Sequence, residues 1–426
     1  MPQCSGVFSM TFRYLCCVKT EITAPVGSFE SLLAALQSKA DSVYFGVGKL
    51  NMRSTAAVNF QISDLSKIVR LCRENQTKAY LALNTVVFDD EADDVSEVLT
   101  EAARCGIDAV ISTDVGVLSL AAEKGLRVHL STQANITNTE AVRFYSRWVD
   151  VVVLSREMSV ERVKTLHSNI ISQNICGPSG NPVRLEGFAH GALCMAISGK
   201  CYLSLDNMNR SANRGDCTQI CRRPYLVKDL EGGVELEIDN KYIMSPRDLC
   251  TVGFLDQLID AGISILKIEG RGRPAEYVST VVSVYNEALA AIENGTYTQE
   301  AIQGWMQRLS KVYNRGFWEG YYMGKPIGEW TNRHGSSATV RREYIGRVTN
   351  YFSKLGVAEV KAETGNVYPG ESISITGPTT GLLETVISEI HLDKGPAAMA
   401  PQGSLFAFPV SRLVRRGDKI FRLVQV

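Results

Sequence analysis

Four cysteines with a regular arrangement mark the part of this chain that is best suited to chemistry. They follow one another as C-x6-C-x15-C-x3-C, at Cys194, Cys201, Cys217 and Cys221, in a segment rich in Gly and Ser. Such a short segment can surround one centre without a long loop closure. Thiolates are soft ligands that select zinc or an iron–sulfur cluster over hard cations. Structural zinc usually takes C-x2-C pairs, whereas iron–sulfur spacings vary more, so the spacing favours a cluster and leaves zinc as the alternative.

The other cysteines bear on the compartment and on the ligand set. The total of eleven is odd, in a chain of 426 residues that is too long to need disulfide staples. This usage predicts a reducing, cytoplasmic setting and argues against two disulfides among the four cysteines. Cys250 is an alternative ligand to Cys221. Because it follows Ser-Pro-Arg-Asp-Leu, we expect it at the start of a helix, half-buried.

The elements that must position the cysteines alternate between short apolar runs and amphipathic helical patterns. Helical stretches such as 28–38, 62–74, 92–105 and 159–167 separate the runs. The eight strand candidates are 21–24, 42–45, 79–84, 109–113, 128–131, 151–155, 185–190 and 265–269. Eight strands in this alternation predict a (β/α)8 TIM-like barrel, with a doubly wound open sheet as the competing fold.

Polar residues stand where several of these strands end, which is where a (β/α)8 barrel builds its active site. For one residue, helix capping explains such a position equally well. The whole set indicates a shared site: Asn84, Asp114, Thr132, Gln133, Asn135, Arg156, His190, Glu269 and Arg271. We expect His190 and Glu269 to transfer protons, because both end strands near the cysteines. The alternative for His190 is a structural histidine that supports the loop.

Basic residues surround the cysteine segment. Guanidinium groups in such numbers form either a solvated rim or a site for carboxylate and phosphate groups, and we favour the site. The cations concerned are Arg210, Arg214, Arg222 and Arg223 beside the cysteines, and Lys267, Arg271 and Arg273 after the last strand. We expect substrate binding by Lys267, Arg271, Arg273, Gln133, Asn135, Arg156 and Arg222. No HExxH or GxSxG hydrolase motif is present in the sequence.

The rest of the chain sets the domain organisation. Residues 1–19 are a mildly apolar leader that we expect to be poorly ordered, and 20–335 are the barrel with its cysteine loop and packing helices. Residues 341–426 show short alternating strands between Gly, Pro and Asp turns, which predicts a C-terminal small β-barrel. No apolar run is long enough to span a membrane. Lys+Arg and Asp+Glu both total 45, so any nucleic-acid contact must come from local patches.

At this point the residues resemble a known family. The run Glu186-Gly-Phe-Ala-His-Gly-Ala-Leu-Cys194 with Ser198-Gly-Lys-Cys201 is similar to the signature of the collagenase-like proteins of peptidase family U32. The similarity extends over about residues 20 to 335, through these further runs: Ala24-Pro-Val-Gly27-Ser, Asp41-Ser-Val-Tyr44-Phe-Gly46, Ser131-Thr-Gln133-Ala-Asn135, Ser245-Pro-Arg-Asp-Leu249, Lys267-Ile-Glu269-Gly-Arg271 and Asn314-Arg-Gly-Phe-Trp318.

The resemblance implies chemistry that the family label does not state. Branches of the family are oxygen-independent hydroxylation proteins with a four-cysteine [4Fe–4S] cluster, acting on ubiquinone precursors, on tRNA or on ribosomal RNA. This chain most resembles the tRNA branch, through the run from His190 to Met195, the run from Arg214 to Arg222 and the C-terminal domain. It departs from the RNA-hydroxylating pattern in the stretch from Pro224 to Tyr242, which is short.

The resemblance therefore predicts an enzyme that makes 5-hydroxyuridine at the tRNA wobble position, with prephenate, a small dicarboxylate, as hydroxyl donor. We expect Lys267, Arg271 and Arg273 to bind its carboxylates. Some relatives act as pairs, which implies either a partner subunit or a homo-oligomer. Two alternatives stay open: the catalogued collagenase-like peptidase, and a non-enzymatic RNA-binding factor whose cluster is structural.

Overall fold

The computed structural model describes residues 19–54, 59–226, 242–324 and 329–426. The predicted leader, apart from Lys19, lies outside the described residues. So does most of the stretch from Pro224 to Tyr242 in which the chain departs from its relatives.

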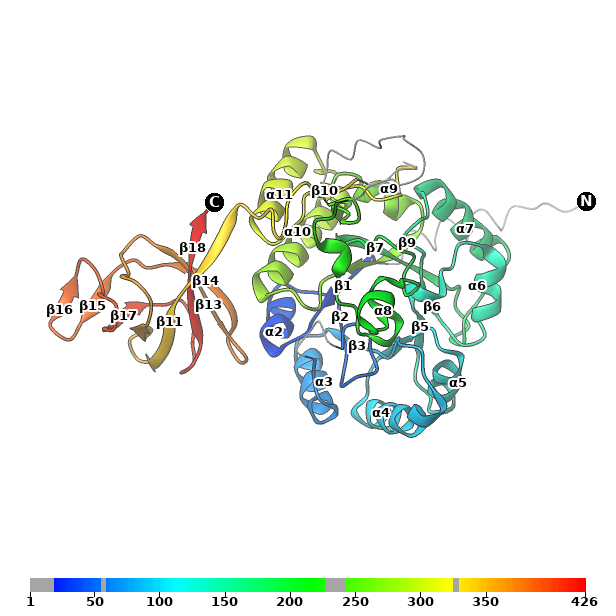
Figure 1. The fold of residues 1–426 in the computed structure, drawn as a ribbon, viewed down its shortest axis with the longest axis horizontal. Helices are drawn as coiled ribbons and strands as arrows, with labels where there is room; N and C mark the ends of the chain where they lie inside the picture. Colours follow the sequence, from blue (N-terminus) through cyan, green and yellow to red (C-terminus); the bar gives the residue numbers. More distant parts are fainter. Residues whose placement is uncertain (1–18, 55–58, 227–241, 325–328) are drawn as a thin grey trace, which may run out of the picture.

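Eight parallel strands close into a barrel, which confirms the predicted fold (Figure 1). β9 pairs with both β1 and β7, so the ring closes and the open doubly wound sheet is excluded. The strands are β1 (Glu21–Pro25), β2 (Ser42–Phe45), β3 (Lys78–Ala82), β4 (Ala109–Ser112), β5 (Val128–Leu130), β6 (Val151–Val153), β7 (Arg184–Ala192) and β9 (Ile263–Ile268).

Helices follow the strands and cover the outside of the barrel (Figure 1). α3 shows why they form, because its buried residues Leu65, Ile68, Val69 and Cys72 recur every three or four positions and make one apolar face. The helices are α2 (Phe29–Gln37), α3 (Leu65–Glu74), α4 (Ala92–Cys105), α5 (Val115–Glu123), α6 (Thr139–Tyr145), α7 (Val160–Ser172), α9 (Leu255–Asp260), α10 (Ala275–Glu293) and α11 (Gln299–Lys311).

Two short strands extend the sheet beyond the predicted set. β8 (Asp248–Cys250) pairs antiparallel with β7, and β10 (Phe317–Trp318) pairs with β8. The expectation of a helix at Cys250 is therefore wrong. The Asp-Leu-Cys run adds to the edge of β7, and α9 begins only at Leu255.

The C-terminal residues form a separate antiparallel sheet with its own apolar core. Its strand order is β14-β13-β18-β11-β12-β17-β15-β16, and no recorded pairing of the described residues joins the two end strands. The strands are β11 (Val340–Phe352), β12 (Val357–Ala362), β13 (Ser372–Gly377), β14 (Gly381–Val386), β15 (Ile390–Leu392), β16 (Gly395–Ala397), β17 (Leu405–Pro409) and β18 (Lys419–Gln425). No described helix is long and apolar enough to cross a membrane.

Candidate functional site

The four predicted ligand cysteines surround one space at the C-terminal mouth of the barrel. A cavity of about 160 Å³, the cysteine cavity, is lined by all four. A second cavity of about 150 Å³, the arginine cavity, shares Cys194, Cys217 and Cys221. Burial raises the pKa of Cys221 to about 11, and the charges of the other three cysteines add to this effect while Arg222 opposes it. The four thiols are therefore close enough to interact electrostatically.

The thiols could hold either of the two metal centres that their chemistry allows. No three His, Cys, Asp or Glu side chains in the described part of the chain gather tightly enough to hold one metal ion. Tetrahedral zinc, with Zn–S near 2.3 Å, needs sulfurs roughly 3.8 Å apart. A cluster with several irons holds its thiolates farther apart, because each one binds a different iron. Four thiols around one cavity supply the soft ligand set that either centre requires.

Hydrogen bonds tie the cysteine loop to neighbouring loops of the barrel. Ser54, after β2, donates from Oγ to the carbonyl of Gly215 at 3.1 Å. Arg214 pairs with Glu91, which lies just before α4, and Val86 donates its backbone N–H to the carbonyl of Asn213. Cys217 follows directly after these contacts, so they fix where its thiol lies at the mouth.

Gly215 is the tightest point of this attachment. It has φ of +85°, and a Cβ there would lie 2.3 Å from the carbonyl oxygen of Asn51. We expect Gly215→Ala to shift the cysteine loop and to lower both the bound iron and the melting temperature. Gly180→Ala is the matched control, since Gly180 has φ of +78° with no atom near its Cβ position and carries only the backbone cost of about 1–2 kcal/mol. Equal iron content in the two variants would contradict the prediction.

The arginine cavity concentrates positive charge beside the thiols. Six arginines line it: Arg53, Arg156, Arg222, Arg271, Arg273 and Arg315. Arg53 pairs with Glu269 at 2.8 Å and Arg315 with Asp248 at 3.4 Å. The other four have no carboxylate within 4.0 Å among the described residues. An anionic ligand would complete their pairing, because buried charges are normally paired.

The four unpaired guanidinium groups are held by neutral partners. Arg222 donates to the carbonyls of Leu193 and Pro246. Arg271 donates to Asn51 Oδ1 at 3.0 Å. Burial lowers the pKa of Arg222, and repulsion from Arg315 lowers it further.

Two of these arginines stack on aromatic rings, and one of them, Arg156, also donates to the carbonyl of Ala192 at 3.2 Å. Arg273 lies 3.5 Å from the ring centre of Tyr313, and Arg156 lies 4.0 Å from that of Phe188. Arg156 Nε is buried and has no hydrogen-bond partner. A carboxylate or phosphate in the cavity would supply the missing acceptor.

Glu269 is the carboxylate of the mouth, and its surroundings keep it ionised. Burial acts to raise its pKa, but the charges of Arg53 and Arg156 and the hydrogen bond from Arg53 hold the pKa at about 2. Tyr44 also donates to Glu269 Oε2 at 3.1 Å. A carboxyl group with so low a pKa is a poor proton donor at neutral pH. The environment of Glu269 therefore favours a role in positioning Arg53 over the proton transfer that we expected from the sequence.

His190 is not brought to either cavity. The pairing of β7 with β9 shifts register between Phe188 and His190, so Phe188 lies beside Lys267 while His190 lies beside Ile268, whose side chain is in the apolar core. His190 consequently lies against Tyr277 and Tyr285 of α10, with ring centres 6.0 and 5.8 Å away. Burial lowers its pKa to about 3. These surroundings are those of a structural histidine, which was the alternative to proton transfer by His190.

Lys267 reaches the floor of the cysteine cavity, but it already has a partner inside the barrel. Its Nζ donates to Glu186 Oε1 at 2.6 Å, and His129 Nδ1 lies 3.3 Å from the other oxygen of Glu186. Burial acts to raise the pKa of Glu186, but Lys267 and His129 hold it at about 2. Sequence reasoning missed Glu186 and His129, although charged and polar residues inside buried strands are a signal that could have found them.

Gln133 and Asn135, predicted together, occupy different places. Gln133 lines the cysteine cavity, where Ser131 Oγ contacts its Oε1 at 3.1 Å. Asn135 lines neither cavity, and its Nδ2 donates to the carbonyl of Gln133 at 2.8 Å. Asn135 therefore supports the Gln133 turn. Arg53 and Tyr44 are further residues of the mouth that the sequence did not point to.

Comparison with known proteins places the chain among its relatives. It is 52% identical to a collagenase of Porphyromonas gingivalis, over 94% of this chain and 97% of that protein. It is 30% identical to tRNA hydroxylation protein P1 of Bacillus subtilis, over 87% of each chain. It is 29% identical to a 23S rRNA 5-hydroxycytidine synthase of Escherichia coli, over 83% of this chain and 57% of that protein.

Of these three relatives, the collagenase shares more identity with the chain than the two RNA-hydroxylating proteins do. The family itself is clear, because residues 27–332 match peptidase family U32 along most of the chain. This chain belongs to peptidase family U32.

Proposed function

We propose that the chain is an iron–sulfur enzyme that hydroxylates RNA, at C5 of the wobble uridine of tRNA, with prephenate as the hydroxyl donor. The observation that carries the proposal is that four cysteines and an anion-binding arginine cavity meet at one mouth of the barrel. The printed names of the relatives from B. subtilis and E. coli supply the substrate class.

Cys194, Cys201, Cys217 and Cys221 would hold a [4Fe–4S] cluster, which when bound supplies one-electron redox chemistry. Hydroxylation converts C5–H to C5–OH, so the base loses two electrons and the donor of the oxygen gains them. The arginine cavity would hold a donor with two carboxylates, because Arg156, Arg222, Arg271 and Arg273 offer guanidinium groups without carboxylate partners.

The part of the cysteine cavity that lies beside the cluster would receive the base. Its wall is apolar at Ile111, Val153 and Phe188, while Gln133 and Asn84 offer amides that can recognise the edge of a pyrimidine. A base inside a stack cannot be reached, so the nucleotide must be extruded into the cavity.

Hydrolysis is the second candidate, because the chain is 52% identical to a protein named collagenase. Among the described residues that line the two cavities there is no histidine to activate a hydroxyl or thiol nucleophile. We therefore rank hydroxylation first.

The deciding experiment uses full-length protein with its cluster reconstituted without air. It is incubated with an unmodified tRNA transcript and prephenate, and the nucleosides are analysed by mass spectrometry. 5-Hydroxyuridine that depends on both the cluster and prephenate supports the proposal. Collagen cleavage that persists when the four cysteines are replaced, with no change in the tRNA, would establish the peptidase instead.

Arg273 provides a separate test of the donor site. Loss of one charged hydrogen bond to a carboxylate costs about 1.5–3 kcal/mol, so we expect Arg273→Ala to raise the KM for prephenate by about 10- to 100-fold. The matched control is Arg127→Ala, because Arg127 is exposed just before β5, at the opposite end of the barrel. A KM in Arg273→Ala equal to that of the control would place the donor elsewhere.

A further inference from the structure

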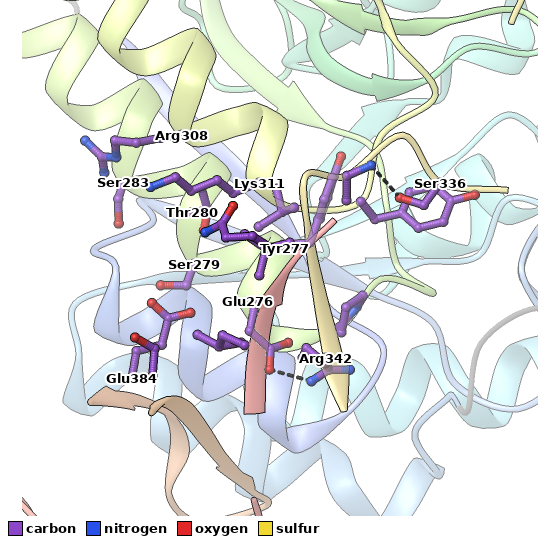
Figure 2. Close-up of a pocket in the computed structure, with 18 residues that line it drawn as sticks. Glu276, Tyr277, Ser279, Thr280, Ser283, Arg308, Lys311, Ser336, Arg342 and Glu384 are labelled. Carbon is purple, nitrogen blue, oxygen red and sulfur yellow. Dashed lines mark hydrogen bonds and ion pairs between the residues drawn. The ribbon is translucent and has the colours of Figure 1, made fainter. Parts of the chain in front are cut away.

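A large cleft lies between the barrel and the C-terminal sheet (Figure 2). No cysteine is among the described residues that line it. Its volume is about 900 Å³. One wall is formed by α10 and α11, and the other by residues of β11, β13, β14 and β18. Nothing in the proposed chemistry at the barrel mouth uses this space.

Specific contacts hold the two walls of the cleft together. Glu276 of α10 accepts a hydrogen bond from Arg342 of β11 (Figure 2). Glu276 also accepts one from Ser374 of β13. Gln37 of α2 donates to the carbonyl of Thr380 at 2.9 Å and accepts from the backbone N–H of Leu382. The cleft is therefore built from walls with defined positions, as ligand sites usually are.

Several polar groups of the cleft have no hydrogen bond or ion pair within the described chain, although the charge of Lys311 opposes the rise in the pKa of Glu384 that burial causes. Lys311 has no ion pair there, and neither the Thr280 nor the Ser283 hydroxyl has a side-chain hydrogen bond. Glu276 is 5% exposed, and its Oε2 atom is buried without a hydrogen bond. Glu384 of β14 adds a second carboxylate to the lining. Together they offer one cation, two hydroxyls and carboxylate acceptors.

The cleft shares a wall with the arginine cavity. Tyr313 lines the cleft, and the guanidinium of Arg273, which lines the arginine cavity, stacks on its ring. Pro274 and Tyr277 continue the same wall, and Tyr277 Oη donates to the carbonyl of Glu269 at 2.8 Å. The stacked pair of Arg273 and Tyr313 therefore lies between the cleft and the arginine cavity.

We propose that this cleft binds the ribose–phosphate backbone of the RNA strand whose reacting nucleotide enters the cysteine cavity. This inference rests on the proposed function and adds a second contact surface to it. Lys311, Thr280 and Ser283 donate to phosphate oxygens. Glu384 accepts from a ribose 2′-hydroxyl, the group that distinguishes RNA from DNA.

The test measures binding of a fluorescent, unmodified tRNA transcript to the full-length protein with its cluster, at several salt concentrations. We expect Lys311→Ala to weaken binding about 3- to 10-fold and to reduce the salt slope by about one, as for the loss of one phosphate contact. Lys354→Ala, in the exposed turn between β11 and β12, is the matched control and changes neither quantity. Glu384→Ala narrows the difference in affinity between an RNA strand and a DNA strand of the same sequence.

The possible outcomes separate the cleft from the chemistry. If Lys311→Ala binds tRNA like Lys354→Ala, the cleft is not an RNA site, even if the protein hydroxylates tRNA. If binding depends on Lys311 but no nucleoside is hydroxylated, the cleft is an RNA site and the proposed reaction is wrong. If the wild-type protein binds no RNA at any salt concentration, both are overturned. Unchanged iron content and melting temperature show that each variant is folded.

Discussion

Cys221→Ala is expected to strip the iron from the protein and to reduce tRNA hydroxylation by at least about 100-fold, whereas Cys250→Ala is expected to retain both. Cys221 lines both cavities at the mouth, beside the other three cysteines. Loss of one thiolate leaves an iron of the cluster without its protein ligand. This is a larger change than loss of a residue that only hydrogen-bonds to a metal ligand, which already costs about 10- to 100-fold. Iron and sulfide analysis of protein purified without air, together with nucleoside mass spectrometry, measures both effects.

Cys250→Ala is a strict control, because the sequence alone left Cys250 as an alternative ligand to Cys221. The structure places it on β8, in register with His190 of β7, and its Sγ lies 3.6 Å from Met306 Sδ. It lines neither cavity, and burial raises the pKa of its thiol to about 12. Removing this one buried sulfur should cost only about 1 kcal/mol of stability. Loss of iron from Cys250→Ala with iron retained in Cys221→Ala would reverse the ligand assignment.

Much of the fold could be predicted from the sequence because strands buried on both faces appear as apolar runs. This is why the eight barrel strands could be predicted within a few residues of their bounds. β8 and β10 were missed because three and two residues are too short to show a period. β15 and β16 could not be predicted for the same reason, because each has three residues.

The candidate site could also be predicted only in part. Residues that directly follow strands, such as Arg156 and Gln133, could be placed at the mouth because strand ends converge there. The direction of the His190 side chain could not be predicted, because it depends on the register shift next to His190 in β7. The role of Arg53 could not be predicted either. Its guanidinium reaches Glu269, 216 positions along the chain, only because the loop after β2 folds over the mouth.

The buried group of Lys267, Glu186 and His129 leads to the second large effect. Glu186→Gln is expected to reduce the free energy of unfolding of the barrel by about 3–5 kcal/mol, because it leaves the Lys267 ammonium buried without a counter-charge. The side chain of Lys267 is only 6% exposed and that of Glu186 is fully buried, so water cannot replace the lost carboxylate. In a thermal melt of the full-length protein, the loss should lower the melting temperature by roughly 5–10 °C.

A double substitution separates this effect from a simple packing defect. Glu186→Gln combined with Lys267→Met removes the unpaired ammonium and keeps a side chain of similar length, so most of the lost stability should return. Equal melting temperatures for the single and double variants would show that Lys267 does not depend on Glu186 for its charge. Recovery of stability without recovery of hydroxylation would have a further meaning. It would show that the charged pair of Glu186 and Lys267, of which Lys267 lines the cysteine cavity, is needed for the reaction itself and not only for the fold.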